Sequence, residues 1–291
     1  MKGVPDDSVK VGIIGGSGLY KMEGLQDIRE IKVRTPFGEP SDNIMVGRLG
    51  EVGLAFLPRH GHGHRIMPTE INYRANIFAL KSVGVERIIS VSACGSLKEE
   101  LRPRDIVIVD QFFDRTTKRI STFFGDGIVA HLGFADPVCP DMAAALVKHA
   151  RLLNLPVHQG GTYVCIEGPE FSTKAESQVW RSLGFSVIGM TNLPEARLAR
   201  EAEICYATIA LVTDYDVWKE EEKVSVEVVV GNMKANIENA KKLIKAVVPE
   251  LAVQRNCECA DALKGAIQTE PAKINRSTVR RLGILVNKYL K

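Results

Sequence analysis

The sequence lacks the features that mark several large protein classes. Its apolar runs, such as ATIALV at 207–212, are far shorter than the roughly 20 residues that cross a bilayer. The first ten residues, MKGVPDDSVK, have no apolar core of the signal-peptide kind. Net charge is only +3 over 291 residues, without the concentrated basic stripe of a nucleic-acid surface. We therefore expect a cytoplasmic globular protein that binds neither membranes nor nucleic acids.

The cysteines lack the spacing of a zinc ribbon, because none of the six forms a C-x-x-C pair. Two of them, Cys257 and Cys259, make an unusual C-x-C. Cytosolic cysteines are usually free thiols, whereas proteins of hyperthermophiles often carry internal disulfides. The spacing leaves both states open.

Short β-branched runs alternate with helical patterns along the chain, which favours an α/β fold with helices on both faces of a sheet. A hairpin is expected around Gly50, and helices capped by Asp141 and by Ser172 are expected in the second half. Residues 252–291 differ, because a polar connector precedes a second helical pattern at 278–290. Strands are expected at 9–16, 42–49, 52–60, 87–96, 105–111, 161–169, 186–190 and 205–216, and helices at 69–84, 141–153, 173–184, 194–202 and 226–251.

The stretch PRHGHGHRIMP, 58–68, holds three of the six histidines at every second position. In an extended segment this spacing places all three rings on one side. The alternatives are a metal site, an anion contact by Arg59 and His60 at the strand end, and a structural loop. Gly61 and Gly63 loosen the backbone, which disfavours a rigid set of metal ligands.

A second candidate is GIIGGSGL, 12–19, a strand that ends in a glycine turn. Backbone N–H groups can approach an anion closely where side chains are absent, and Ser17 adds a hydroxyl donor. The stretch is neither a P-loop nor a good dinucleotide fingerprint, since no Gly-Lys-Ser/Thr follows and the glycine spacing differs. A tight structural turn is the alternative.

Other polar residues follow predicted strands. Cys94 in SACGS is expected to be a buried thiol rather than a nucleophile, since no neighbour would lower its pKa. Phe171 is either core or a stacking surface for a flat ligand. Asp214 and Asp216 lie on one side of an extended segment, where a pocketed carboxyl could stay neutral and donate a proton.

Eight stretches, in order over about residues 10–250, resemble the trimeric nucleoside phosphorylases, and most of all the members that act on methylthioadenosine. They are GIIGGSGL, TPFGEPSD, RHGHGHRIMPTEINYRANI, SACGSL, DQFFDRT, IEGPEFSTKAES, GMTNLPEA and VTDYDVW. The resemblance implies a single α/β domain over 1–250, with a central mixed, partly barrel-like sheet flanked by helices. Residues 251–291 would pack on that domain or on a neighbouring subunit. It also implies a homotrimer or a homohexamer built from two trimers.

The implied reaction is phosphorolysis of 5′-methylthioadenosine to adenine and 5-methylthioribose 1-phosphate, in purine and methionine salvage, without metal or organic cofactor. A broader phosphorylase that also takes adenosine or inosine is the alternative within the family. A nicotinamide-dependent dehydrogenase and a histidine-rich metal-binding module are the alternatives outside it.

Each site residue is implied by its match to a family motif. Phosphate would contact Ser17, Arg59, His60, Ser92, Ala93 and Thr191. The nucleoside would contact Phe171, Ser172, Met190, Val226, Val229 and His131, the last lent by a neighbouring subunit. Asp214 and Asp216 would act on the base.

Base choice follows from hydrogen-bond chemistry. Relatives that take 6-oxopurines carry glutamate in place of Ser172 and asparagine in place of Asp214. A 6-amino group is a donor and needs an acceptor, so the carboxyl favours adenine. Gly189 stands where vertebrate-like members commonly have asparagine. The resemblance also extends to archaeal members with a C-x-C and disulfides, in which Cys139 and Cys205 would be bridged.

Overall fold

The computed structural model describes residues 9–16, 18–219 and 225–290. A mixed sheet of 11 strands forms its centre, with the order β2-β3-β4-β1-β5-β10-β9-β7. The long strand β5 is a branch point, since it also pairs with β11, which continues to β6 and β8. The predicted mixed α/β fold is confirmed, although the sheet does not close into a barrel. The strands are β1 (Val9–Gly15), β2 (Leu25–Ile31), β3 (Ile44–Leu49), β4 (Val52–Pro58), β5 (Arg87–Ser96), β6 (Ile106–Ile108), β7 (Gln111–Asp114), β8 (Val157–Gln159), β9 (Thr162–Cys165), β10 (Val187–Gly189) and β11 (Cys205–Asp214).

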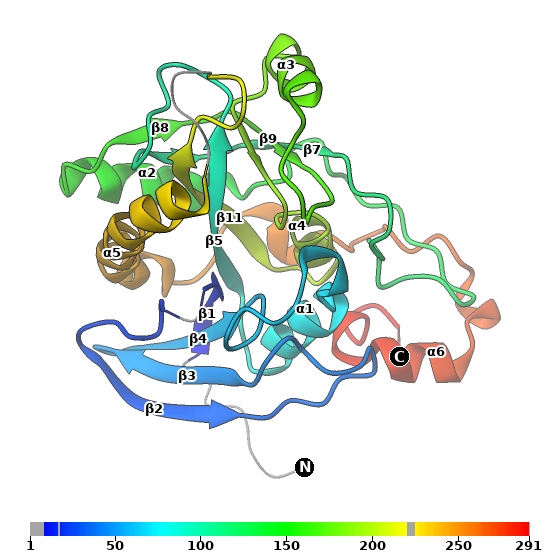
Figure 1. Cartoon of the computed structure of the whole chain (residues 1–291). Coiled ribbons are helices and arrows are strands. Elements are labelled where there is room, and N and C mark those ends of the chain that lie inside the picture. The colour runs from blue at the N-terminus through cyan, green and yellow to red at the C-terminus, as the bar shows by residue number, and fades with distance from the viewer. Residues whose placement is uncertain (1–8, 17, 220–224, 291) are drawn as a thin grey trace.

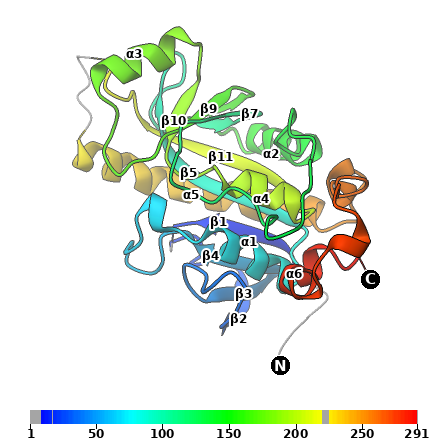
Figure 2. The same ribbon diagram turned by 90° about the vertical axis from the view of Figure 1, so that its right-hand side faces the viewer.

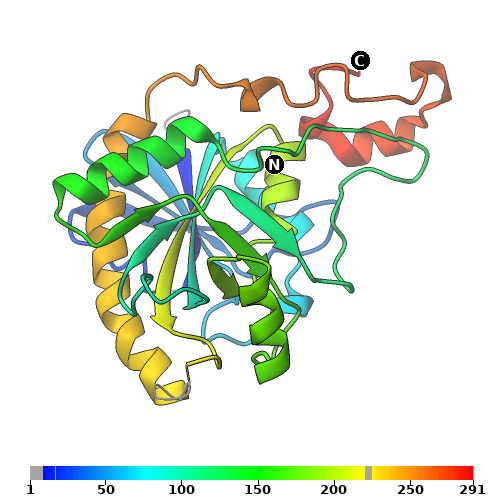
Figure 3. The same cartoon turned by 90° about the horizontal axis from the view of Figure 1, so that it is seen from above.

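Helices cover both faces of the sheet (Figure 1). On one face lie α2 (Pro140–Leu152) and α5 (Val226–Leu251), and on the other lie α1 (Tyr73–Ser82) and α4 (Glu195–Glu201). α3 (Lys174–Ser182) packs at the end of the molecule opposite β2 (Figure 2). Seen from above, the strands fan out inside a ring of helices, with the C-terminal segment along the outside (Figure 3).

The sheet positions its strands through two-sided burial. Every residue of β11 is buried, as expected for a parallel strand with helices on both faces. Alternate side chains point to opposite faces, so Tyr206 and Ala210 join the core under α1 and α4, whereas Ala207 and Ile209 join the core under α2 and α5.

Most predicted elements are present, with corrections at their ends. The hairpin around Gly50 is formed by β3 and β4. Two predicted caps are wrong: α2 follows Cys139, with Pro140 in its first turn, and Thr173 caps α3 through a reciprocal bond with Glu176. Thr173 provides the better cap because its hydroxyl accepts the N–H of Glu176, three residues on.

The C-terminal segment, residues 252–290, packs on the same chain. Its helix α6 (Arg276–Leu282) is shorter than predicted, because Gly283 takes a φ of +49° and leads into a 3-10 turn at Gly283–Leu285. Leu282 and Leu285 are buried in the core beside α1. Each described helix is too short or too polar to span a membrane.

Candidate active site at the carboxyl ends of the strands

The predicted site residues lie at the ends of neighbouring strands. Arg59 follows β4, Ser92 lies in the second half of β5, Thr191 follows β10, and Asp214 ends β11. β1, β4, β5 and β11 run parallel, so their carboxyl ends meet at one edge, where α/β sheets commonly bind ligands.

Arg59 is buried in a dense set of acceptors. Its Nε and Nη2 donate to the two carboxylate oxygens of Glu195 at 2.8 and 2.9 Å. Nη1 donates to the Val91 carbonyl at 2.9 Å, and Nη2 to the Ser90 hydroxyl at 2.6 Å. Burial alone would lower the pKa of Arg59, but Glu195 raises it above its ordinary value, so the guanidinium stays charged. Among the described residues, Nη1 has the Val91 carbonyl as its one acceptor, so its second N–H is left for a ligand.

Glu195 is a buried partner of Arg59 that was not predicted from the sequence. Its side chain is 0% exposed, and besides Arg59 it accepts hydrogen bonds from the hydroxyls of Ser90 and Tyr206, each at 2.9 Å. Acidic residues are common in the first turn of surface helices. Nothing in the local sequence separates Glu195 from them.

His60 is half-buried and stacks on His64, with ring centroids 4.3 Å apart. Its Nδ1 lies 2.8 Å from the Ile66 carbonyl, and since a carbonyl only accepts, Nδ1 carries the hydrogen. Burial lowers the pKa of His60 to about 4. The neutral ring therefore presents the Nε2 lone pair, which suits a hydroxyl donor rather than a bare anion oxygen.

The metal alternative for the histidine-rich loop finds no support. His62 and His64 are exposed. Among the described residues, these histidines do not come together with other ligand atoms in a group of three. The backbone N–H of His62 donates to Asp42 at 2.6 Å, so this part of the stretch is a solvated loop that follows Arg59 and His60.

Three hydroxyls meet beneath the strand ends. Ser92 Oγ lies 3.1 Å from Thr191 Oγ1 and 3.2 Å from Tyr163 Oη, and all three side chains are buried. Ala93, next to Ser92, is exposed at the edge. The Tyr163 hydroxyl occupies the space beside Gly189, where an added β-carbon would overlap it. Tyr163 thus occupies the space that a side chain at position 189 would need.

Arg119 joins two loops of the site. Its Nη1 donates to the carbonyls of Met190 and Leu193 at 2.6 and 2.7 Å, and its Nε donates to Glu167 at 2.9 Å. Burial raises the pKa of Glu167, but hydrogen bonds, from Thr117 and Arg119 among others, outweigh it and lower the pKa to about 2. Arg119 therefore fixes the backbone around Met190, which is itself half-buried.

Asp214 and Asp216 form an interlocked pair. The N–H of Asp216 donates to Asp214 Oδ1 at 2.8 Å, the Thr213 hydroxyl donates to Asp214 Oδ2 at 2.6 Å, and the Ser177 hydroxyl donates to Asp216 Oδ2 at 2.5 Å. Burial raises the pKa of both carboxyls above the usual value. The prediction of one extended segment is wrong, because β11 ends at Asp214 and Asp216 has a φ of +52°.

A cleft of about 260 Å³ is lined mainly by the loop before α3 and by α3 itself. Phe171 and Ser172 line it. Phe171 is 52% exposed, and the buried Ser172 hydroxyl has no hydrogen-bond partner among the residues that the structure describes. α3 also carries Ser177, the partner of Asp216, so the cleft and the acidic pair share one helix. An exposed ring and an unpartnered buried hydroxyl suit a flat polar ligand.

Four predicted site residues remain. Ser17 and the side chain of Val226 lie outside the described residues. Val229 is half-buried in the first turns of α5. His131 is exposed, and its backbone N–H donates to the Ala266 carbonyl at 2.9 Å. Figures 1 and 3 place its segment on the side of the molecule away from the start of α5.

All six cysteines are free thiols in this structure. The bridge implied between Cys139 and Cys205 is therefore absent. Cys94 is the buried thiol that the sequence predicts, and burial raises its pKa well above the ordinary value, which argues against a nucleophile.

The chain matches known proteins over nearly its whole length. Residues 10–249 match the model of the phosphorylase superfamily. The chain is 57% identical over 282 residues to the S-methyl-5′-thioadenosine phosphorylase of Geobacter sulfurreducens, and the match covers 96% of this chain and 99% of that one. It is 54% identical over 269 residues to the same-named protein of Hyperthermus butylicus, covering 90% and 98%.

Solved structures agree. A methylthioadenosine phosphorylase from an Antarctic soil metagenomic library superposes with a TM-score of 0.92 at 49% identity, covering 96% of this chain and 99% of that one. The methylthioadenosine phosphorylase of Schistosoma mansoni, in complex with adenine, gives a TM-score of 0.83 at 38% identity, covering 89% and 99%. With the strand-end site in place, these matches show that the chain belongs to the phosphorylase superfamily.

Proposed function

We propose that this chain is an S-methyl-5′-thioadenosine phosphorylase, which uses inorganic phosphate to release adenine and 5-methylthioribose 1-phosphate. The observation that carries the proposal is the buried pair Asp214 and Asp216, which the Ser177 hydroxyl joins to α3, in a chain 57% identical to a protein of that name. Two carboxyls with raised pKa provide both a proton donor and an acceptor for a 6-amino group.

Phosphate binds at the other end of the site. The remaining Arg59 Nη1 hydrogen, the hydroxyls of Ser92 and Thr191, and the Ala93 N–H are its donors, with Ser17 from the glycine turn. Arginine, hydroxyl and backbone N–H donors are the groups that recognise phosphate. Neutral His60 accepts a hydrogen bond, from a ribose hydroxyl or from the P–OH of monohydrogen phosphate.

The chemical step needs charge stabilisation at two places. Breaking the ribosyl bond creates an oxocarbenium-like sugar, as in glycoside hydrolysis, and phosphate both stabilises and captures this cation. The departing adenine gains negative charge, and Asp214 relieves it by donating a proton at N7. Asp216 holds the 6-amino group. The reaction requires no covalent enzyme intermediate, metal ion or organic cofactor.

Substrate specificity rests on the remaining contacts. Phe171 and Ser172 line the base, and Met190 packs against the ribose. Val226 and Val229 line an apolar pocket for the 5′-methylthio group, closed by His131 of a neighbouring subunit. An apolar pocket favours methylthio over hydroxyl by only about 1–3 kcal/mol.

A homotrimer, or a hexamer of two trimers, completes the site, because the segment that contains His131 lies on the side of the molecule away from the start of α5 (Figures 1 and 3). Exposed apolar side chains in the same part of the chain support a subunit contact there: Phe113, Ile120 and Val129 are 40%, 59% and 48% exposed. We place the enzyme in the cytoplasm, in purine and methionine salvage.

The test is a rate comparison on methylthioadenosine, adenosine and inosine, each with and without phosphate. Methylthioadenosine should have the highest kcat/KM, and release of base should require phosphate. Similar values for all three nucleosides would favour the broad-specificity alternative, and inosine as the best substrate would refute the proposal. A verified monomer that keeps full turnover would refute the shared site.

A further inference from the structure

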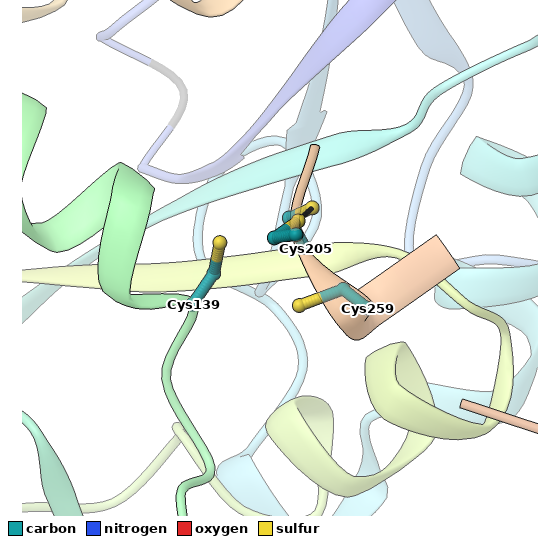
Figure 4. A group of neighbouring side chains, drawn as sticks. Cys139, Cys205 and Cys259 are labelled. Carbon is teal, nitrogen blue, oxygen red and sulfur yellow. Dashed lines mark hydrogen bonds between the residues drawn. The ribbon is translucent and has the colours of Figure 1, made fainter. Parts of the chain in front are cut away.

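Four cysteine thiols gather at the end of the sheet remote from the candidate active site. Cys139, Cys205, Cys257 and Cys259 each place a sulfur within 4.8 Å of the other three. Figure 4 shows three of them approaching from different segments. Cys205 begins β11, whereas Asp214 ends it, so about 30 Å of strand separates the cluster from the acidic pair.

The four thiols come from three parts of the chain. Cys139 precedes α2, and the C-x-C pair begins the 3-10 turn Glu258–Asp261 in the C-terminal segment. Cys139, Cys205 and Cys259 are buried, and Cys257 is half-buried. This is the composition and burial of a closed structural zinc site, which takes four thiolates and no solvent ligand.

The sulfur separations do not select a pair for disulfide formation. Around one zinc ion with Zn–S bonds of about 2.3 Å, neighbouring sulfurs lie roughly 3.8 Å apart. Cys205 Sγ lies 3.3 Å from Cys257 Sγ, which is closer to that spacing than to a bonded pair at about 2.05 Å. This contact joins Cys205 to Cys257, whereas the resemblance implies a bridge from Cys205 to Cys139.

Helix α2 begins directly after one of the four cysteines. Cys139 is the N-cap of α2, so the positive end of the α2 dipole lies at this residue and favours its thiolate form. Cys257 likewise stands at the start of the 3-10 turn Glu258–Asp261.

A cation stands beside the third sulfur. Arg255 Nη1 lies 3.9 Å from Cys205 Sγ and donates to the Glu203 carbonyl at 2.7 Å. Four thiolates and one Zn²⁺ carry two negative charges in total, so a fixed guanidinium at this distance favours the metal-bound form.

We propose that Cys139, Cys205, Cys257 and Cys259 bind one Zn²⁺ ion as a four-thiolate structural site. The ion ties the C-terminal segment to β11 and α2. Beyond the C-x-C, this segment pairs with residues 128–131: Gln268 donates to Val129, and His131 donates to Ala266, both at 2.9 Å. The site therefore anchors the connector that supports His131, and it takes no part in the reaction itself.

Metal analysis of the full-length protein, purified with a thiol reductant and without added metal, tests the proposal. We expect about one zinc per chain and an X-ray absorption spectrum with only sulfur neighbours at about 2.3 Å. Cys257→Ser should lose most of the zinc and unfold at a lower temperature. The matched control Cys165→Ser removes a buried cysteine outside the cluster and should keep its zinc.

Several results would overturn it. If all six thiols react and no metal is bound, the cluster is only a group of free thiols. If alkylation without reductant adds less mass than six modified thiols would, disulfides form instead. Iron in place of zinc, or nitrogen and oxygen neighbours in the spectrum, would also refute the assignment. If Cys257→Ser does not fold, the metal content and spectrum of the unmodified protein still decide.

Discussion

Removing one partner of the Arg59–Glu195 ion pair should cost more stability than its place in a phosphate site suggests. Arg59→Met leaves a carboxylate that is 0% exposed, and within the described part of the chain its remaining donors are the hydroxyls of Ser90 and Tyr206. Leaving a buried charge without its partner costs about 3–5 kcal/mol. At roughly 2–4 °C per kcal/mol for a chain of this size class, Tm should fall by about 6–20 °C.

A double-mutant cycle separates this cost from any general loss of packing. Glu195→Gln alone should also destabilise the fold, because it leaves the buried Arg59 guanidinium without a negatively charged partner. Arg59→Met with Glu195→Gln should cost less than the sum of the single changes by at least about 1.5 kcal/mol. The assay is thermal unfolding followed by Trp fluorescence at one fixed protein concentration, since assembly shifts Tm. Additivity of the two changes within about 0.5 kcal/mol would refute the coupling.

Kinetics on the same variants test the phosphate role. Arg59→Met should raise the KM for phosphate by about 10- to 150-fold, the value of a hydrogen bond to a charged group, with little change in the KM for nucleoside. Glu195→Gln keeps the guanidinium and should raise it less, because Glu195 only positions Arg59. Equal KM increases for phosphate and nucleoside would indicate distortion of the fold instead.

Three further outcomes follow. Asp214→Asn should lower kcat/KM for methylthioadenosine by about 10²–10⁴-fold and raise the inosine-to-methylthioadenosine ratio; an unchanged ratio would contradict the base assignment. Burial raises the pKa of Glu201 to about 7, so its neutral form stabilises the fold below pH 4.5 and this contribution, roughly 3 kcal/mol, is lost as pH rises through 7. Thermal unfolding from pH 5 to 8 should show this fall in the parent chain and a flatter profile in Glu201→Gln; identical profiles would be inconsistent with it. His60→Ala should reduce turnover. His62→Ala, on the exposed part of the same loop, should leave the KM for phosphate within about two-fold. Effects of equal size from the two substitutions would restore the metal alternative.

The sequence predicts the architecture well because the buried strands are rich in apolar and small residues. β11 and β5 are recognisable from CYATIALVTD and RIISVSACGS alone. Residues at the ends of such strands come together by topology, and the family resemblance implied that Arg59, Ser92 and Asp214 belong to one site. The ends of elements were harder to predict. Thr173 rather than Ser172 caps α3, and a one-residue difference of this kind depends on local backbone geometry.

The residues that support the site could not be predicted in the same way. Glu195 lies 136 positions from Arg59, and Arg119 lies 71 positions from Met190. In sequence each is one charged residue among many, typical of a solvated face. Their burial and pairing arise only when distant elements pack together.

The cluster of four cysteines is another feature that spacing in the sequence does not predict. The absence of C-x-x-C argued against a zinc ribbon, but spacing rules describe ligands held by a short loop. Here Cys139 lies 66 positions before Cys205, and Cys205 lies 52 positions before Cys257. The sheet and the C-terminal segment, rather than a local turn, bring the four thiols together.

The Tyr163 side chain and a side chain at position 189 cannot occupy the same space, and this constrains how the sequence can change in evolution. A substitution that adds a side chain at Gly189 overlaps the tyrosine hydroxyl, so it destroys packing unless position 163 becomes smaller first. The order of the two steps therefore matters: Tyr163 first gives a foldable intermediate with a looser hydroxyl network, whereas Gly189 first gives one that cannot pack. The two positions form an epistatic pair, and among relatives we expect them to vary together.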